Sequence, residues 1–509
     1  MTLRNGNEHY REVSPDEFRN ECVSLWKKNC LPRLLFATDE RETGQGFCLY
    51  AVFSSPGEDR FEIPFMKLAE GTFSFQSLTV DIPAFHWYER EIRDMFGLVP
   101  EGHPDERQLV LHDCYPKDIF PLRRDVTVEA IKERTDDQRI DRYPYIKVDG
   151  EAIYEIPVGP VHAGIIEPGH FRFSAVGETV YYLDPRLFYV HKGVEKHFES
   201  AGFNKGVALA ERISGVSTIG HGVAYCRAVE RMAGVSIPQK AVAGRTILLE
   251  LERLYNHVGD IANMCAGTGF AVGYARGTSL REELQALNGR VTGSRFLRGA
   301  LQLGGLSRDV LEHAQHILDT VLSVHDKFIK YKKFLFSDVG HMERLDNTGI
   351  LPEEIARNLG ATGPAARASG IQDDIRTSHP YLAYKRHAPE PFAELTGDAL
   401  ARLNVRAREI DYSVSVIQSL LSRPVTGGIS ADIPEIAAGS HALGYTEGPR
   451  GSIFYFVKAS ENGRPLRVKV RSASYCNWPV ISFAVKGNIV PDFPLINKSF
   501  NLSYSGCDM

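Results

Sequence analysis

Apolar side chains recur at helical spacing between residues 247 and 261, and this stretch limits the fold more than any other. The series consists of Ile247, Leu251, Leu254, Val258 and Ile261. Alternating steps of four and three residues place these side chains on one face of an α-helix, where they form an apolar stripe. A stripe of this length needs other helices to cover it, so we predict a helical bundle.

Two further stretches carry the same pattern. One starts at Ser307 and presents Leu311, Ala314, Leu318, Val321 and Leu322, and another starts at Thr396 and presents Ile410, Val414, Ile417 and Leu421. We expect both stretches to form helices whose stripes belong to the core. The runs Ser452–Ala459 and Leu466–Val470 predict strands that follow the bundle.

The first 125 residues show a different pattern. Ser14 followed by Pro15 and Glu17 is typical of a helix start, and this helix should reach about Asn29. Short alternating runs then predict a small antiparallel sheet, at Arg33–Thr38, Phe47–Ser54, Arg60–Met66 and Phe73–Asp81. A short helix at about Trp87–Met95 should end at Gly97.

These patterns divide the chain. We predict an α+β domain at residues 1–125 and a mainly α-helical domain, a helical bundle with small β-sheets, at residues 151–509. Residues 126–150 are highly charged and hold few large apolar side chains, so we interpret them as a linker. A length of 509 residues suits two or three domains.

Composition excludes several functions. The formal net charge of −5 gives no electrostatic reason to expect nucleic acid as a partner. No apolar run reaches about 18 residues, and the polar start lacks the apolar core of a signal peptide, so we expect a cytoplasmic protein. The eight cysteines form no C-x-x-C pair, and no G-x-G-x-x-G loop occurs between a strand and a helix. We therefore expect neither a cysteine-only metal site nor a dinucleotide site.

Two polar stretches are candidates for function. His162, Glu167 and His170 crowd a segment that glycine and proline interrupt. Imidazoles beside a carboxylate can relay protons near neutral pH, although a β-turn with polar ends explains the spacing equally well. Between residues 89 and 94, mixed charges on the expected helix indicate either a solvated ion-pair face or a docking surface.

Longer motifs surround both stretches. Residues 86–97 read H-W-Y-E-R-E-I-R-D-M-F-G, and G-H-P-D and P-L-R-R-D follow. This combination resembles the 30-kDa subunit of respiratory complex I, which favours the docking surface. Residues 167–173 (E-P-G-H-F-R-F), 214–221 (S-G-V-S-T-I-G-H) and 501–508 (N-L-S-Y-S-G-C-D) resemble the large subunit of nickel–iron hydrogenases of the formate hydrogenlyase type. That subunit is related to the 49-kDa subunit of complex I, and the combined resemblance covers nearly the whole chain.

The resemblance also exposes a difference. In the hydrogenases the two metal-binding segments read C-G-I-C-G-x-x-H and D-P-C-x-x-C, and their four cysteines correspond here to Ser214, Ser217, Ser503 and Gly506. Serine hydroxyls are hard and stay protonated near pH 7, so they do not replace soft thiolates. We therefore predict no metal and no cofactor within this chain, and we expect no cleavable C-terminal extension.

What remains could be a cavity for a small acceptor. The resemblance implies a proton route through Glu167 and, by analogy with complex I, a quinone cavity beside the loop that carries His162. Arg367 and Arg450 follow Gly-Pro turns, which suit a rigid guanidinium that holds an anion or a carbonyl. The residues expected at this cavity are Ser214, Ser217, His221, Ser503, Arg367 and Arg450, with Glu167, His162 and His170 as a proton relay.

The family implies partners as well. We expect a peripheral subunit on the cytoplasmic face of the cell membrane, in a redox complex that couples electron transfer to ion translocation. An iron–sulfur small subunit similar to the 20-kDa subunit of complex I would supply electrons, beside antiporter-like and quinone-site membrane subunits. NAD would bind only to other subunits. Two alternatives stay open, namely an active nickel–iron hydrogenase, which the replaced ligands oppose, and a non-catalytic scaffold of an ion-translocating complex.

Overall fold

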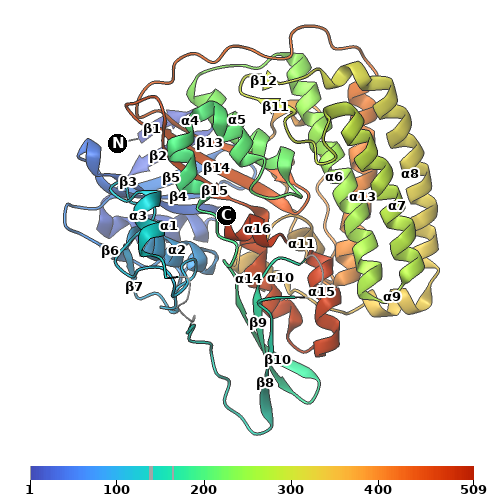
Figure 1. The fold of residues 1–509 in the computed structure, drawn as a ribbon, viewed down its shortest axis with the longest axis horizontal. Coiled ribbons are helices and arrows are strands. Elements are labelled where there is room, and N and C mark those ends of the chain that lie inside the picture. Colours follow the sequence, from blue (N-terminus) through green and yellow to red (C-terminus); the bar gives the residue numbers. More distant parts are fainter. Residues whose placement is uncertain (1, 137–141, 163–165) are drawn as a thin grey trace.

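The computed structural model describes residues 2–136, 142–162 and 166–509. Figure 1 shows the N-terminal sheet on the left, long helices on the right and a small sheet that extends at the bottom. The C-terminal helix lies near the centre of this view. Residues 137–141 of the predicted linker and residues 163–165 of the segment between His162 and His170 lie outside the described residues.

A five-stranded sheet with the order β1-β2-β5-β4-β3 forms the N-terminal region. Its strands are β1 (Thr2–Asn5), β2 (Glu8–Glu12), β3 (Leu31–Glu40), β4 (Gly46–Ser54) and β5 (Phe61–Lys67). The antiparallel pairing of β3, β4 and β5 is as predicted. The sequence does not predict β1 and β2, and β2 pairs with β5 in parallel, so a purely antiparallel sheet is wrong. Helix α1 (Pro15–Lys27) begins after Ser14, as expected, and packs on β5.

The predicted strand at Phe73–Asp81 is also wrong. Only β6 (Ser74–Gln76) forms there, and it pairs in parallel with β7 (Val99–Glu101) in a separate sheet. The chain turns after β6 because the buried Glu89 carboxylate accepts hydrogen bonds from the backbone and hydroxyl groups of residues 77–79, at 2.5–2.7 Å. This contact comes from a later helix, and the local alternation of residues 73–81 carries no sign of it.

Helix α2 (His86–Phe96) carries the mixed charges and ends, as predicted, at Gly97, whose φ is 69°. Its charges are not a solvated face, because Glu89, Arg90, Glu91 and Asp94 are all buried. Glu91 forms an ion pair with Lys469 from the C-terminal sheet. The docking interpretation is therefore confirmed for contact with the large segment.

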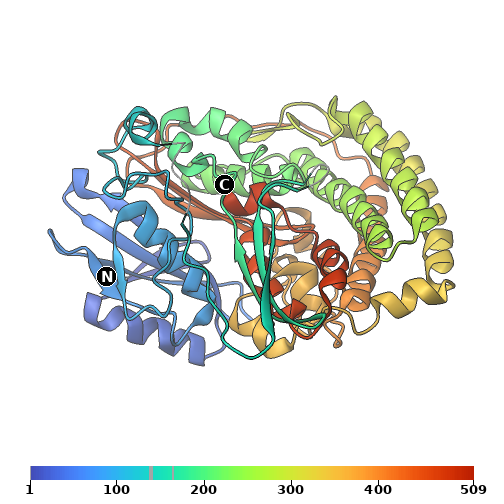
Figure 2. The same ribbon diagram turned by 60° about the horizontal axis from the view of Figure 1, so that its bottom comes forward.

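A three-stranded antiparallel sheet follows the predicted linker. It consists of β8 (Ile153–Val158), β9 (His170–Val176) and β10 (Thr179–Arg186), in the order β10-β9-β8. Figure 2 brings this sheet to the front, between the N-terminal region and the helices. Before it, residues 126–136 contain the short helix α3 (Val128–Arg134).

Long helices make up most of the remaining chain. They are α4 (Val194–Ala210), α5 (Thr218–Met232), α6 (Gln239–Gly267), α7 (Ala271–Thr292), α8 (Ala314–Phe336) and α13 (Ala399–Leu421). Helices α6, α7, α8 and α13 pack against one another, so the predicted bundle is confirmed (Figure 1). Shorter elements are β11 (Leu301–Gln302), β12 (Gly305–Leu306), α9 (Val339–Leu345), α10 (Glu353–Asn358), α11 (Gly363–Ala368) and α12 (Ile375–Ser378).

The predicted stripes hold for α6 and α13 but shift in α8. Helix α8 begins at Ala314 rather than Ser307, because residues 310–313 form a 3-10 turn capped by the Asp309 side chain. Its buried face is Ile317, Val321, Val324, Phe328, Tyr331 and Leu335. Of the expected stripe, only Val321 is buried, and the others are half-buried.

A second three-stranded sheet and three helices close the chain. The sheet consists of β13 (His441–Gly448), β14 (Gly451–Ala459) and β15 (Pro465–Arg471), and the helices are α14 (Ala473–Val485), α15 (Phe493–Phe500) and α16 (Tyr504–Asp508). The sheet contacts the N-terminal sheet, with the Phe36 and Phe456 ring centroids 4.6 Å apart. One continuous cluster of buried apolar residues runs through both regions. Within the described residues, no helix is both long and apolar enough to span a membrane.

Candidate functional site

Residues from two distant segments meet at one place. The Ser214 hydroxyl donates a hydrogen bond of 3.1 Å to the Ser503 hydroxyl, across 289 positions of sequence. A Cβ atom added to Gly506 would lie 3.1 Å from the Ser214 Cβ and 3.2 Å from the Ser503 Cβ. Three of the four positions singled out in the sequence are therefore in direct contact. We call Ser214, Ser503 and Gly506 the serine site.

The fourth residue, Ser217, precedes helix α5. Its N–H donates to the Ser214 carbonyl at 3.2 Å, and its carbonyl accepts from the His221 N–H at 3.1 Å. Glu252 from α6 holds the start of this helix, because its carboxylate accepts from the N–H groups of residues 219–220 at 2.7 and 2.9 Å. Burial raises the pKa of Glu252 to about 7. The loop of Ser214 and Ser217 is thus fixed to the bundle.

Helix α16 carries the other half of the serine site. The Ser503 hydroxyl accepts from the Gly506 N–H at 2.9 Å and so caps this helix. The Glu167 carboxylate accepts from the Ser505 N–H at 2.9 Å. Glu167 is exposed, and it is the predicted relay residue that the structure places beside the serine site.

Arg450 holds the segment that leads to Ser503. Its Nε donates to the Asn501 carbonyl at 2.5 Å, its Nη1 to the Asn256 side chain at 2.9 Å and its Nη2 to the Asp260 carboxylate at 2.9 Å. Burial alone would raise the pKa of Asp260, but the neighbouring guanidinium groups, Arg450 foremost, bring it below its usual value. All three nitrogens of Arg450 are engaged, so this residue positions the chain around the serine site.

The two predicted relay histidines bond to the backbone. His162 Nε2 lies 2.8 Å from the Gly169 carbonyl oxygen, and His170 Nδ1 lies 3.1 Å from the Gly159 carbonyl oxygen. Burial lowers the pKa of His170. Both imidazoles therefore stabilise the connection between β8 and β9. Among the described residues, no hydrogen bond joins either ring to Glu167.

His221 and Arg367 are engaged elsewhere. His221 Nδ1 lies 2.9 Å from the Tyr455 hydroxyl, and burial lowers the His221 pKa to about 3, so the ring is neutral near pH 7. Arg367 donates to Glu409 from Nε and Nη2, at 3.0 and 2.7 Å, and to Glu447 from Nη1, at 3.0 Å. The structure does not bring Arg367 to the serine site through any of these contacts.

Sequence reasoning missed the buried ion network around Arg367. Its members are Glu250, Arg253, Arg367, Asp374, Arg376, Glu409 and Glu447, and all are buried. They connect α6, α11, α12, α13 and β13. The available signal was the pair Glu250 and Arg253, which interrupts the apolar stripe residues of α6. Buried charges of this kind need partners, since a charge left unpaired costs several kcal/mol.

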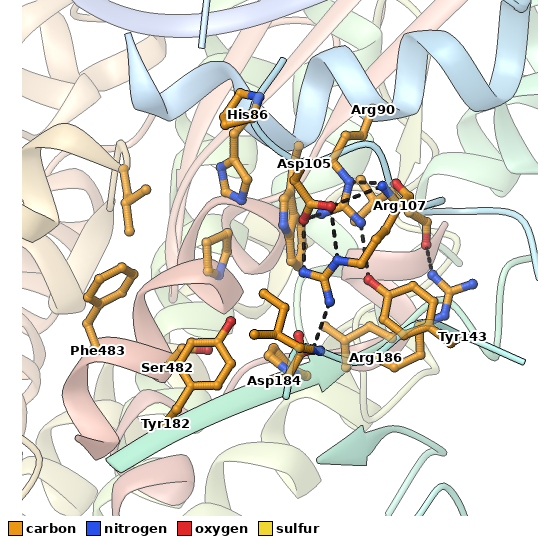
Figure 3. A pocket seen from close by; sticks show the side chains of 18 of the residues that line it. His86, Arg90, Asp105, Arg107, Tyr143, Tyr182, Asp184, Arg186, Ser482 and Phe483 are labelled. Atoms are coloured by element: carbon orange, nitrogen blue, oxygen red, sulfur yellow. Dashed lines mark hydrogen bonds and ion pairs between the residues drawn. The ribbon is translucent and has the colours of Figure 1, made fainter. Parts of the chain in front are cut away.

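A cavity of about 600 Å³ opens where the N-terminal region meets β10 and α14 (Figure 3). Asp105 pairs with Arg90 at 3.0 Å and with Arg107 at 2.8 Å, and Arg107 reaches Asp184 of β10 at 2.7 Å. Tyr143 accepts from Arg90 at 3.2 Å. The G-H-P-D motif is therefore part of the joint between the two regions.

The rest of this junction cavity is largely apolar. Phe483 of α14 and Tyr181 of β10 line it with 45% and 55% of their surface exposed. His86 also lines it, and burial lowers its pKa to about 3, so it adds no charge near pH 7 (Figure 3). Sequence reasoning missed this cavity because its walls come from several separate segments.

Comparison with known proteins decides the family. Residues 12–132 match the family described as respiratory-chain NADH dehydrogenase, 30 Kd subunit, and residues 268–442 and 434–509 match the 49 Kd subunit. The chain is 34% identical over 485 residues to hydrogenase-4 component G of Escherichia coli, which covers 93% of this chain and 83% of that protein. This chain belongs to the family of hydrogenase and complex I large subunits.

Other members of the family agree. Formate hydrogenlyase subunit 5 of Escherichia coli is 33% identical over 486 residues, covering 93% of this chain and 84% of that protein. NADH-quinone oxidoreductase subunit 4 of Thermus thermophilus is 30% identical over 378 residues, covering 69% and 92%. A chain in the structure of the membrane-bound sulfane sulfur reductase, an archaeal respiratory membrane complex, matches with a TM-score of 0.66 and 26% identity, covering 70% of this chain and 99% of that one. The chain is thus homologous to subunits of membrane-bound hydrogenases and of complex I.

The residues at the serine site do not fit the family's nickel centre. Nickel in such a centre takes thiolates, whereas Ser214 and Ser503 offer hydroxyls that bond to each other, and Gly506 offers no side chain. The neighbouring Cys507 is buried, and burial raises its thiol pKa, which disfavours the thiolate that a metal needs. In the described part of the chain, no group of three His, Cys, Asp or Glu side chains is placed to hold a metal ion.

Proposed function

We propose that this chain is the large subunit of a membrane-associated redox complex in which the serine site binds a small electron acceptor, such as a quinone, instead of nickel. The contact between Ser214, Ser503 and Gly506 carries this proposal. In this contact the two segments that carry the metal ligands in the hydrogenases still meet, but serine hydroxyls, which can bind a carbonyl, replace the thiolates. A serine hydroxyl donates one hydrogen bond and accepts two.

The surroundings of the serine site support a partner that covers it. Ser503 and Ser505 are half-buried, and Glu167 is exposed beside them. On the same β8–β9 connection, Val161 and Ile166 expose 86% and 53% of their surface. An apolar, half-open rim of this kind suits a permanent subunit interface. We assign it to an iron–sulfur small subunit similar to the 20-kDa subunit of complex I.

The reaction would consume two electrons and two protons for each quinone reduced to quinol. The electrons would come from the cluster of the small subunit, because the serine site itself offers no redox group. We propose that Glu167 moves protons between solvent and the serine site, and the hydrogen bond from the Ser505 N–H to its exposed carboxylate supports this role. His162 and His170 would hold the connection between β8 and β9 and extend the relay.

The remaining assembly follows from the family. We propose antiporter-like and quinone-site membrane subunits as further partners, with this chain peripheral on the cytoplasmic face and NAD bound only by other subunits. We also propose that residues 1–125 and 151–509 are separate domains joined by residues 126–150. The matches of residues 12–132 and 268–509 to different subunit families support this division.

Acceptor reduction by the purified complex tests the proposal. We expect Ser214→Ala/Ser503→Ala to raise the KM for a short-chain ubiquinone analogue about tenfold, the cost of lost hydrogen bonds. The complex should still assemble. Ser323→Ala, on an exposed face of α8, is the control and should leave KM unchanged.

Each alternative predicts a different result. An active hydrogenase would contain nickel and consume hydrogen. A scaffold would bind neither the quinone analogue nor quinone-site inhibitors, and His162→Ala would change nothing. If the double serine variant still reduces quinone with an unchanged KM, the acceptor binds at a site other than the serine site.

A further inference from the structure

A second large cavity, of about 680 Å³, lies away from the serine site and from the junction cavity. Its walls come from residues 6–7, from the C-terminal half of α5, from the start of α6, from residues 380–387 and from residues 420–425. None of these residues belongs to the motifs of the proposed redox site. We call it the cationic cavity.

Arg227 is its central charge. The guanidinium lies between two aromatic rings, 4.5 Å from the Tyr381 centroid and 4.3 Å from the Tyr445 centroid. Its Nη1 donates to the Tyr445 carbonyl oxygen. Among the described residues, no carboxylate approaches Arg227 within ion-pair distance. A planar cation held between two rings is rigid, and its remaining N–H groups can bind an anion in a fixed geometry.

Two more cations face the cavity without a carboxylate. Lys385 and Arg386 are exposed at its edge, and neither forms an ion pair within the described part of the chain. The other charges of the wall are already balanced. Arg231 pairs with Glu8 at 2.7 Å, and Glu230 pairs with Arg245 at 2.6 Å.

Among the described wall residues, a single acidic group is left to offset these three cations. Asp59 lines the cavity and accepts from the Asn7 side chain at 2.6 Å. The wall therefore keeps an excess of positive charge at a concave surface, where a bound anion is partly shielded from water and counter-ions.

We propose that the cationic cavity binds a small organic phosphate. The three cations exceed the single wall carboxylate of Asp59 by two charges, so a ligand with one carboxylate would leave part of this excess unbalanced. A phosphate monoester carries up to two negative charges and accepts bidentate hydrogen bonds from arginine. The apolar part of the wall could cover the organic part of the ligand: it includes Val242, Leu382, Leu420 and Val425. A volume of about 680 Å³ lies in the range of ligand sites.

Calorimetric titration of the full chain with adenosine monophosphate tests this inference. At constant ionic strength we expect a Kd below about 1 mM, with inorganic phosphate weaker and uncharged adenosine weaker still. Arg227→Gln should weaken binding about 10- to 100-fold, the value of a charge-assisted pair. Lys385→Glu/Arg386→Glu changes exposed side chains only, so it tests the charge without endangering the fold.

Lys327→Gln, an exposed lysine on α8, is the matched control and should bind like the wild type. Displacement of adenosine monophosphate by vesicles that contain phosphatidylglycerol would identify a lipid headgroup as the phosphate source, and its absence would identify a soluble ligand. A Kd above about 10 mM, or equal affinity for adenosine, would overturn the proposal. So would binding that both charge variants leave unchanged. These results do not depend on the serine site.

Discussion

Replacing Lys469 by methionine tests how the N-terminal region is attached to the rest of the chain. The Lys469 ammonium pairs with Glu91 of α2 and lies 3.3 Å from Glu195 of α4, and the Lys469 side chain is only 1% exposed. In the variant, Glu195 keeps Arg467 at 2.7 Å, but Glu91 loses its cation inside the protein. Breaking a buried pair in this way costs about 3–5 kcal/mol of the free energy of unfolding.

The loss of unfolding free energy in Lys469→Met should depend on pH. Burial raises the pKa of Glu91 above the usual 4.5, and removal of Lys469 raises it further. Below about pH 4.5 the carboxyl is protonated in both the folded and the unfolded chain, so the penalty is small there. As pH rises above 4.5, the unfolded chain releases the proton first, and both proteins lose stability. Above the folded pKa of Glu91 in the wild type, only the variant continues to lose stability, so the difference between the two proteins grows.

Urea unfolding at about pH 5 and about pH 8 measures both effects. Lys327→Met is the control, because Lys327 pairs with Glu283 at 2.6 Å with 48% and 37% of these side chains exposed. The control should lose at most about 1 kcal/mol. If Lys469→Met loses no more than this control, or loses the same amount at both pH values, the ion pair does not hold the two regions together.

Four further predictions concern Gly444, Ser503 and His221, and all are measured by urea unfolding unless stated. Gly444→Ala should cost about 3 kcal/mol, because the added Cβ would lie 1.9 Å from the Ala224 carbonyl oxygen of α5; a loss under about 1 kcal/mol would mean that α5 and β13 separate easily. Ser503→Ala should cost about 1 kcal/mol through loss of the α16 cap, and a neutral result would contradict the cap. The His221 ring should stay neutral when its NMR signal is followed from pH 8 to pH 5, since its pKa is about 3, and a midpoint near the usual 6.5 would refute its burial. Because only the unfolded chain gains a proton on His221 as pH falls below 6.5, His221→Phe should make stability less sensitive to acid.

Local patterns sufficed for much of the fold. Helix α6 was predictable because its apolar side chains repeat at helical spacing, and α2 because Gly97 ends it in a left-handed conformation. The failures share one cause. Strand β6 stops early because the Glu89 carboxylate bonds to residues 77–79, and α8 starts late because Asp309 caps a separate turn. Both contacts are specific hydrogen bonds that periodicity does not reveal.

The candidate site was also predictable only in part. Motif spacing identified Ser214 and Ser503, and the structure joins them at 3.1 Å. Spacing also grouped His221 and Arg367 with them, although His221 bonds to Tyr455 and Arg367 to two glutamates. Motif membership indicates the neighbourhood of a residue, whereas its hydrogen-bond partners depend on elements that are distant in sequence. Neither cavity was predictable, because each takes its walls from several distant segments.

We propose that the serine site holds no nickel. The most direct test measures nickel and iron in the complex purified with its native partners, together with hydrogen uptake by the same sample. We expect iron from the partner's cluster, no stoichiometric nickel and no hydrogen turnover. If the sample contains stoichiometric nickel and turns over hydrogen, and a complex that lacks this chain does neither, the serine site holds nickel and the proposal is wrong.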